Sequence, residues 1–204
     1  MKKLIPVILL AIITSGMVYA QGSLADALKE IKSKGNYDTL VYYGADFSRV
    51  RINDAPKISK NDVYSKSYPS AWIQYVEKEL SPDLYVRNVL GYKNFLYRQG
   101  DIFEKSVAVN PRLITSSDNA IPADTLKAMV EKYKVHAKSG LGLVLIPETF
   151  SKPQETAYTW VVFFDIKSRM ILYKAKTIGA CAHMGYTAHW ASGVVEGFKK
   201  FASH

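Results

Sequence analysis

The chain has 204 residues, of which 48% are hydrophobic and 12% aromatic, so it carries enough apolar material to fold around a core and is not an intrinsically disordered protein. Its 27 basic and 18 acidic residues give a formal net charge of +9, which favours association with anionic partners without identifying a fold. A single cysteine, Cys181, excludes an internal disulfide framework.

The first 20 residues predict a secretory signal peptide. Lys2 and Lys3 precede a short apolar run over residues 4–13, and Ala20 lies just before the predicted cleavage point. The apolar run is shorter than the ~20 residues that a membrane-spanning helix needs. We therefore expect an exported protein, periplasmic or secreted, whose mature form is one domain over residues 21–204 without a transmembrane span.

The first predicted elements are a helix and a strand. Ser23 and Asp26 have the spacing of a capping box, and the apolar residues of 24–34 fall on one helical face. Residues 39–45 are rich in β-branched and aromatic side chains and predict a strand, in which Gly44 indicates a bulge or the strand end.

The middle of the chain is less clear. Residues 47–52 either continue the first strand or pair back on it, and residues 53–67 are polar enough to form a surface loop. Apolar residues spaced by four predict a helix over 70–80. Residues 84–97 fit either a helix or short strands.

The second half predicts a strand over 102–109, a helix from Pro122 to Ala137, and two strands, 141–146 and 159–166, that are apolar on both faces. A tight connection at 167–169 then leads to a further strand.

That further strand, residues 170–178, is expected to form a hairpin with 159–166 and to place Lys174 and Lys176 on a solvated side. A closing helix follows, with Thr187 as its N-cap. Its buried stripe is expected to contain Trp190, Val194, Phe198 and Phe201. The order of elements predicts an α/β (α+β) fold, a single mixed-sheet domain with helices packed on the sheet, and three layers are compatible with it.

One cluster of residues could carry catalytic or metal chemistry. Cys181 and His183 are two positions apart, and His189 follows six residues later, with Asp165 as a conceivable fourth ligand. These side chains could bind a metal ion or form a nucleophile and base. The spacing matches no established zinc pattern, and the alternative is that Cys181 is a small residue at the edge of the core.

Two isolated carboxylates are the next candidates. Asp46 and Asp165 each end an apolar strand, where α/β folds often place ligands. A close pair could perform acid–base chemistry, but nothing in the sequence brings the two together. The alternative is that each bonds the backbone of its own turn.

The stretch from Tyr64 to Arg98 interleaves aromatic and basic side chains, a composition typical of binding surfaces. We take Tyr85, Arg87 and Tyr92 as its candidate contact residues; the alternative is that about half of its tyrosines belong to the core. Lys174 and Lys176 are candidates for a second basic surface. The sequence contains no phosphate-binding glycine loop, nucleophile elbow or zinc-protease motif.

The last segments, VVFFD, ILYKAKTIG and HWASGVVEGFKKF, resemble the ends of small exported bacterial proteins. The order of elements over 141–201 is also similar to the α/β domain of penicillin-binding-protein activators and to the amino-terminal domain of TolB. This resemblance implies an envelope adaptor or binding domain without catalysis.

We therefore expect a non-catalytic domain that binds an envelope protein or an anionic polymer, with no cofactor and no nucleic acid. The alternative is a thiol- or metal-dependent enzyme that uses Cys181, His183 and His189. The sequence leaves the ligand and the oligomeric state open.

Overall fold

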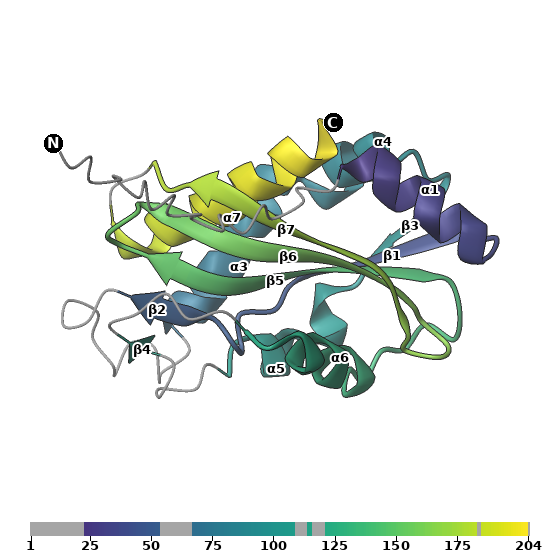
Figure 1. The fold of residues 1–204 in the computed structure, drawn as a ribbon, viewed down its shortest axis with the longest axis horizontal. Helices are drawn as coiled ribbons and strands as arrows, with labels where there is room; N and C mark the ends of the chain where they lie inside the picture. Colours follow the sequence, from purple (N-terminus) through teal and green to yellow (C-terminus); the bar gives the residue numbers. More distant parts are fainter. Residues whose placement is uncertain (1–22, 54–66, 109–113, 116–120, 183–184, 204) are drawn as a thin grey trace, which may run out of the picture.

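The fold was analysed in a computed structural model, which describes residues 23–53, 67–108, 114–115, 121–182 and 185–203 (Figure 1). The predicted signal segment lies outside these residues, as does most of the predicted loop over 53–67.

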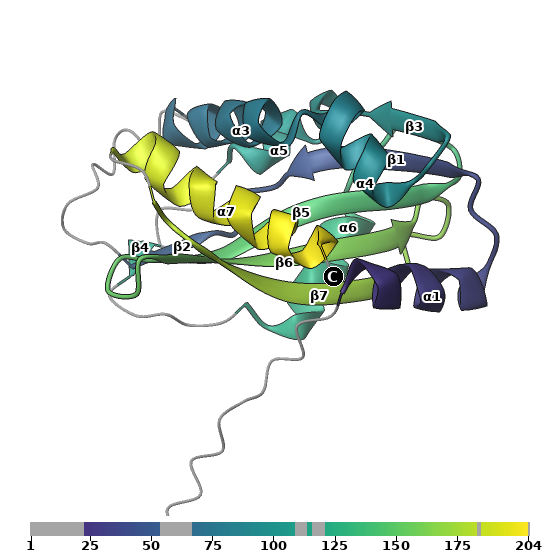
Figure 2. The same ribbon diagram turned by 90° about the horizontal axis from the view of Figure 1, so that it is seen from above.

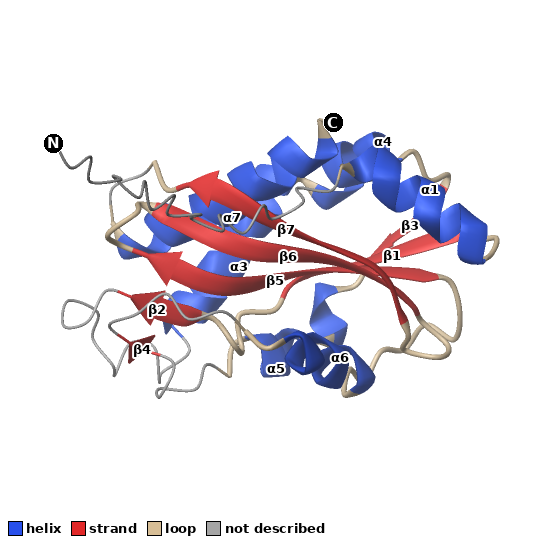
Figure 3. Ribbon diagram, viewed as in Figure 1, coloured by secondary structure: helices blue, strands red, loops and turns tan. Residues whose placement is uncertain are grey.

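The described residues form one mixed sheet with helices on both faces, which confirms the predicted α/β class (Figures 1 and 3). The strands are β1 Thr39–Ala45, β2 Arg51–Asn53, β3 Asn94–Tyr97, β4 Ile114–Thr115, β5 Leu141–Ser151, β6 Thr156–Asp165 and β7 Ile171–Ala180. The α-helices are α1 Leu24–Lys34, α3 Ser67–Leu80, α4 Arg87–Leu90, α5 Phe103–Ser106, α6 Ala123–Glu131 and α7 Tyr186–Ala202. A π-helical turn η1, Pro82–Val86, precedes α4, and a 3₁₀ turn η2, Gln99–Asp101, follows β3.

The long strand β5 organises the sheet. Along one edge, β1 runs parallel to its first half and β2 parallel to its second half. Outside these lie β3, parallel to β1, and β4, parallel to β2. Along the other edge β6 is antiparallel to β5, and β7 is antiparallel to β6. Every residue of β5 is buried, as predicted for the apolar run 141–146, but the strand continues five residues further, to Ser151, through polar positions that the sequence did not place in it.

Two cores of unequal size cover the two faces of the sheet. On the first face α1, α3 and α7 pack against the strands, and the larger core includes Trp72, Phe150 and Trp190 (Figure 2). On the second face α6 covers a smaller core that includes Leu126 and Val144. The molecule therefore has three layers, and the two faces are called below the α7 face and the α6 face.

Gly44 is needed where β1 bends away from β5. Its φ is +75°, a region that favours glycine, and the register with β5 shifts between Tyr42 and Ala45. A Cβ atom at this position would lie 1.7 Å from the Gln99 Oε1, because the Gln99 amide packs against the bend. The bulge predicted from the sequence is thus confirmed and is fixed by a side chain from another segment.

Several predicted elements are confirmed closely. Helix α1 and strand β1 have the predicted bounds, and the Ser23–Asp26 capping box is present. Residues 51–53 form β2, which runs parallel to β5 as β1 does. The chain therefore continues along β5 after β1 and does not pair back on β1. The predicted stripe of the closing helix is buried throughout.

The predicted strand over 102–109 is wrong, because residues 103–106 form the short helix α5. The Ser106 N–H donates to the Ile102 carbonyl at 2.8 Å, a helical bond, and the Ser106 hydroxyl caps the Phe103 carbonyl. Ile102, Ser106 and Val107 are all buried, so the turn packs three nearby positions inward, where a strand would send alternate ones outward. The ambiguous residues 84–97 divide into η1, α4 and β3.

Two helix ends also differ from the prediction. Helix α6 ends at Glu131, six residues before the predicted end, although the apolar side chains of the prediction are buried. The chain leaves the helix there because the Tyr133 hydroxyl and the His136 backbone N–H both bond acids of other segments. Thr187 lies within α7, whose N-cap is Gly185.

Candidate functional site

The five predicted binding residues lie on two different parts of the molecule. Tyr85, Arg87 and Tyr92 belong to the η1–α4–β3 segment on the α7 face, whereas β7 carries Lys174 and Lys176 on the α6 face. Cross-strand pairing shows the second placement: Lys174 is opposite Val162, whose side chain belongs to the smaller core. The two candidate surfaces of the sequence analysis therefore lie on different faces of the sheet.

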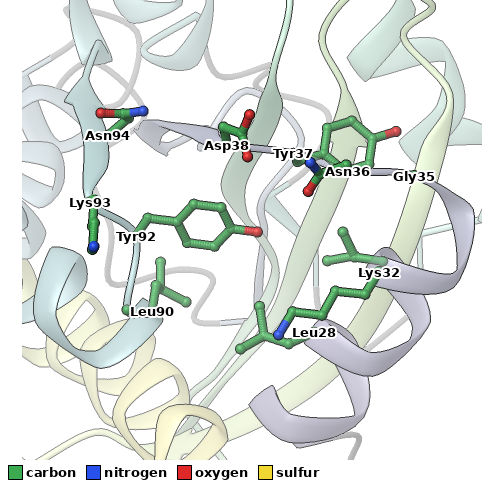
Figure 4. Close-up of a pocket in the computed structure, with 12 residues that line it drawn as sticks. Leu28, Lys32, Gly35, Asn36, Tyr37, Asp38, Leu90, Tyr92, Lys93 and Asn94 are labelled. Carbon is green, nitrogen blue, oxygen red and sulfur yellow. The ribbon is translucent and has the colours of Figure 1, made fainter.

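A groove lies beside Tyr92, between α1, the loop that follows it and the loop before β3. We call it the α1–β3 groove; its volume is about 470 Å³, within the range of small-molecule sites. Its lining residues are Leu28, Ile31, Lys32, Gly35, Asn36, Tyr37, Asp38, Leu90, Gly91, Tyr92, Lys93 and Asn94 (Figure 4). The loops meet here because β1 and β3 are parallel neighbours, so the segments that enter them lie side by side.

Two tyrosines supply most of the aromatic surface of the groove. The ring of Tyr92 extends from the β3 side toward α1, and Leu28 and Lys32 lie opposite it (Figure 4). Burial raises the pKa of Tyr92, so its hydroxyl stays protonated at neutral pH. The ring of Tyr37 packs over Gly35, where an added Cβ atom would lie 3.4 Å from the ring.

The position of Tyr37 is held from outside the groove by Asp165. Burial raises the pKa of Tyr37, and so do the charge of Asp165 and a side-chain hydrogen bond between the two. The Asp165 carboxylate also accepts from the backbone N–H and the hydroxyl of Ser168, at 2.6 and 2.7 Å. Although partial burial opposes ionisation, these hydrogen bonds hold the pKa of Asp165 below its usual value. Asp165 is thus a turn residue, as the alternative interpretation held.

The polar groups of the groove are suited to hydroxyls and to negative charge. Lys32 and Lys93 are exposed on its two walls, while Asp38 is its single acid, so the lining has a small positive charge. Asn36 and Asn94 add amides that both donate and accept hydrogen bonds. An apolar floor, aromatic walls and convergent polar groups are the features that small-molecule binding sites share, so this groove is the candidate site.

The other two predicted aromatic and basic residues, Arg87 and Tyr85, do not line the groove. Arg87 donates to the Lys93 carbonyl at 3.3 Å and thereby braces the loop that carries Tyr92. Gly91, which allows this loop its left-handed turn, has a φ of +68°. Tyr85 is directed toward α7, where the Lys199 ammonium lies 5.7 Å from its ring centre.

On the α6 face, the prediction that Lys176 faces solvent is wrong. Its ammonium is buried and bonds the Glu148 carboxylate at 2.6 Å, with both side chains at most 6% exposed. The Trp160 ring lies 4.7 Å from the same ammonium, and its indole N–H donates to Glu148. The alternation of the strand sends Lys176 to the α6 face as expected, but there its ammonium pairs with Glu148, whose carboxylate also accepts from the Ile121 N–H. Lys174 remains exposed.

The surroundings of Cys181 do not favour nucleophilic chemistry. Cys181 is buried, and burial raises the pKa of its thiol to about 12, with a further contribution from the charge of Glu155. The thiolate that nucleophilic chemistry requires is therefore absent at neutral pH. His189 lies 2.8 Å from the Glu155 carboxylate, and His183 is outside the described residues. Within the described part of the chain, no three His, Cys, Asp or Glu side chains are grouped to hold a metal ion.

Asp46 is fully buried at the carboxyl end of β1. Its carboxylate accepts from the Tyr133 hydroxyl at 2.7 Å and from the Ser48 backbone N–H at 2.9 Å. The Asp46 backbone N–H donates to the Leu145 carbonyl of β5, whereas Asp165 is the cross-strand partner of Leu141. The two acids are therefore separated along β5. The structure does not assemble the carboxylate pair that acid–base chemistry would need.

Sequence reasoning missed Tyr37 and Lys32, which share the groove with Tyr92. The polar sequence Asn36-Tyr37-Asp38 before a strand was the available signal, but it acquires meaning only once β3 is known to lie beside β1. No family model, curated protein or solved structure matches the chain. Among the residues that the structure describes, no helix combines the length and apolarity that crossing a membrane requires.

Proposed function

We propose that this protein is an exported, non-catalytic binding domain that holds a segment of an anionic, hydroxyl-rich polymer in the α1–β3 groove. The observation that carries the proposal is the composition of the groove: Tyr37 and Tyr92 on an apolar floor, with a lysine on each wall. Tyrosine rings offer apolar faces to sugar-like rings and retain a polar hydroxyl.

Charge and sequence support the same partner class. The net charge of +9 attracts anionic material, and the amino-terminal sequence has the pattern of a secretion signal. An exported basic protein meets acidic polysaccharides and other envelope polymers. The alternative partner is an envelope protein that presents a similar acidic segment, and a capture experiment would identify it.

The test is binding of an acidic oligosaccharide built from galacturonic acid units, with a neutral glucose oligomer of equal length as the comparison ligand. We expect the acidic ligand to bind and the neutral one to bind about tenfold more weakly or not at all. Raising the salt concentration should weaken the acidic complex, because the lysines are exposed and therefore screened.

Two variants on one helix provide a matched pair. Lys32 lines the groove, whereas Lys29 is equally exposed on α1 but outside the lining. Lys32→Gln and Tyr92→Ala should each weaken binding severalfold or more, while Lys29→Gln should leave it unchanged. Equal losses for Lys29→Gln and Lys32→Gln would show that only net charge matters and would overturn the groove as the site.

A further inference from the structure

A second cavity lies at the opposite ends of the same two strands. It has a volume of about 280 Å³ and is lined by Leu96, Arg98, Asp101, His136 and Ala137. This volume lies just below the usual range of drug-sized pockets, so it fits a small molecule or one end of a larger one. The cavity shares no residue with the α1–β3 groove.

The topology places this cavity where open α/β sheets bind ligands. From the carboxyl end of β1 the chain passes through β2 to α3, on the α7 face, before it enters β3. From the carboxyl end of β3 the chain passes to α6, on the other face, before it enters β5 (Figures 1 and 2). Open α/β sheets bind ligands outside the carboxyl ends of their parallel strands, and Leu96 and Arg98 place this cavity at the carboxyl end of β3.

The side chains at this point form an ordered couple. The Asp101 carboxylate, only 10% exposed, accepts from the His136 backbone N–H at 2.9 Å and lies 2.8 Å from the His136 Nδ1. Because an ionised carboxylate only accepts, Nδ1 carries a proton, and Nε2 remains for a ligand. The imidazole itself is 86% exposed, so ligand access is unobstructed.

Arg98 adds a cation to the same cavity. Its backbone carbonyl accepts from the Asp101 N–H in the η2 turn. The Asp101 carboxylate is close in sequence to Arg98 but bonds the His136 ring. Among the described residues, the Arg98 guanidinium forms no hydrogen bond or ion pair. Its five fixed donors match the oxygens of a phosphate or carboxylate.

Asp101 is the single acid of the cavity lining, and its carboxylate is already bonded to His136. The apolar side chains Leu96 and Ala137 supply a wall without competing charge. The region is thus suited to a small anion.

We propose that Arg98 and His136, with Asp101 as the positioning residue, form a binding site for an oxyanion group, a phosphate or a carboxylate, on a small molecule. The site does not rest on the function proposed for the groove. Arg98 contacts the anion, and His136 Nε2 either accepts from a ligand hydroxyl or, when protonated, donates to the oxyanion.

The test is an NMR titration of the protein with sodium phosphate, with sodium chloride at equal ionic strength as the reference. We expect saturable shifts of the His136 ring signal and of the Ala137 amide with phosphate alone. Arg98→Gln and His136→Gln should each weaken phosphate binding about tenfold or more, whereas Lys32→Gln in the α1–β3 groove should not change it.

Parallel titrations with glucose 6-phosphate and glucuronate identify the source of the oxyanion. Tighter binding of either compound than of glucose supports the site and assigns the group. Shifts that chloride reproduces, or unchanged affinity in Arg98→Gln, would overturn the proposal. Because Arg98 and His136 are exposed, a preserved amide spectrum in their variants shows that a loss of binding is not a loss of fold.

Discussion

The two faces of the sheet are stabilised by different interactions. On the α7 face the aromatic rings of Trp72, Phe150 and Trp190 pack directly on one another, and the Phe150 and Trp190 rings are parallel to within 2° at 5.3 Å. On the α6 face the smaller apolar core is accompanied by two buried polar contacts, Glu148 with Lys176 and Asp46 with Tyr133. The nine-residue helix α6 leaves room for buried charged side chains on its face. Under the longer helices α3 and α7, the described core contains aromatic and aliphatic side chains instead.

The largest effect should come from the aromatic packing. Trp190→Ala removes a fully buried ring from the stack with Phe150, and we expect the free energy of unfolding to fall by about 4 kcal/mol. Chemical denaturation measures it. Met170→Ala, at a side chain that is 59% exposed, is the control and should change little. Similar losses for both would contradict the role of the stack.

Breaking the buried ion pair should be nearly as severe. Lys176→Met leaves the Glu148 carboxylate buried without its cation, and we expect a loss of about 3 kcal/mol in unfolding free energy. The exposed neighbour Lys174→Met should stay within about 0.5 kcal/mol of the parent. Combining Lys176→Met with Glu148→Gln removes both charges and should restore most of the stability. A double variant as unstable as the single one would show that the charge is not the cause.

Close contact between α7 and the sheet should be sensitive to one methyl group. A Cβ atom at Gly193 would lie 2.7 Å from both Ala157 Cβ and Cys181 Sγ, so Gly193→Ala should destabilise by about 2 kcal/mol. Gly100→Ala is the matched control, because its added Cβ atom meets nothing within 4 Å. A thermal melt of both variants decides whether α7 can shift away without loss.

The Asp46 contact should contribute less. Tyr133→Phe removes the hydroxyl that donates to the fully buried carboxylate, and we expect about 1.5 kcal/mol of destabilisation. Tyr85→Phe, on the α7 face, should be nearly neutral. Equal stability of the two variants would mean that Asp46 does not depend on Tyr133.

The smallest effect concerns alkaline pH. The pKa of Cys181 is about 12 in the folded protein and near 9 in the unfolded chain, so the folded state keeps its proton longer. The contribution of the buried, protonated thiol to the free energy of unfolding is therefore complete below pH 9 and is lost as the pH rises toward 12. By pH 10 the parent should lose about 1 kcal/mol that Cys181→Ala does not lose. Parallel pH profiles of the two proteins would contradict a buried thiol.

The sequence predicted elements best where local signals agreed. The capping box at Ser23 marks the start of α1 together with a helical period, the continuous apolar run over 141–146 marks the buried strand β5, and the spacing of Trp190, Val194, Phe198 and Phe201 marks the buried stripe of α7. It failed at 102–109, where partial alternation resembled a strand although the short turn α5 packs its buried residues on one side.

The candidate sites were harder to predict, because they depend on which strands become neighbours. Tyr92 was found from composition, but its partners Tyr37 and Lys32 lie more than 50 residues away in the sequence and meet it only through the pairing of β1 with β3. Lys176 has the same alternation as Lys174, and the buried lysine differs from the exposed one by its ion pair with Glu148, a residue of another strand.

The most direct test of the account is an amide-resolved NMR titration with the acidic oligosaccharide. We expect the shifted signals to cluster at residues 35–38 and 90–94, the two loops of the α1–β3 groove, and Lys32→Gln to weaken the same shifts. Shifts centred on the α6 face around Lys174, or spread evenly over all basic surfaces, would contradict the groove as the binding site.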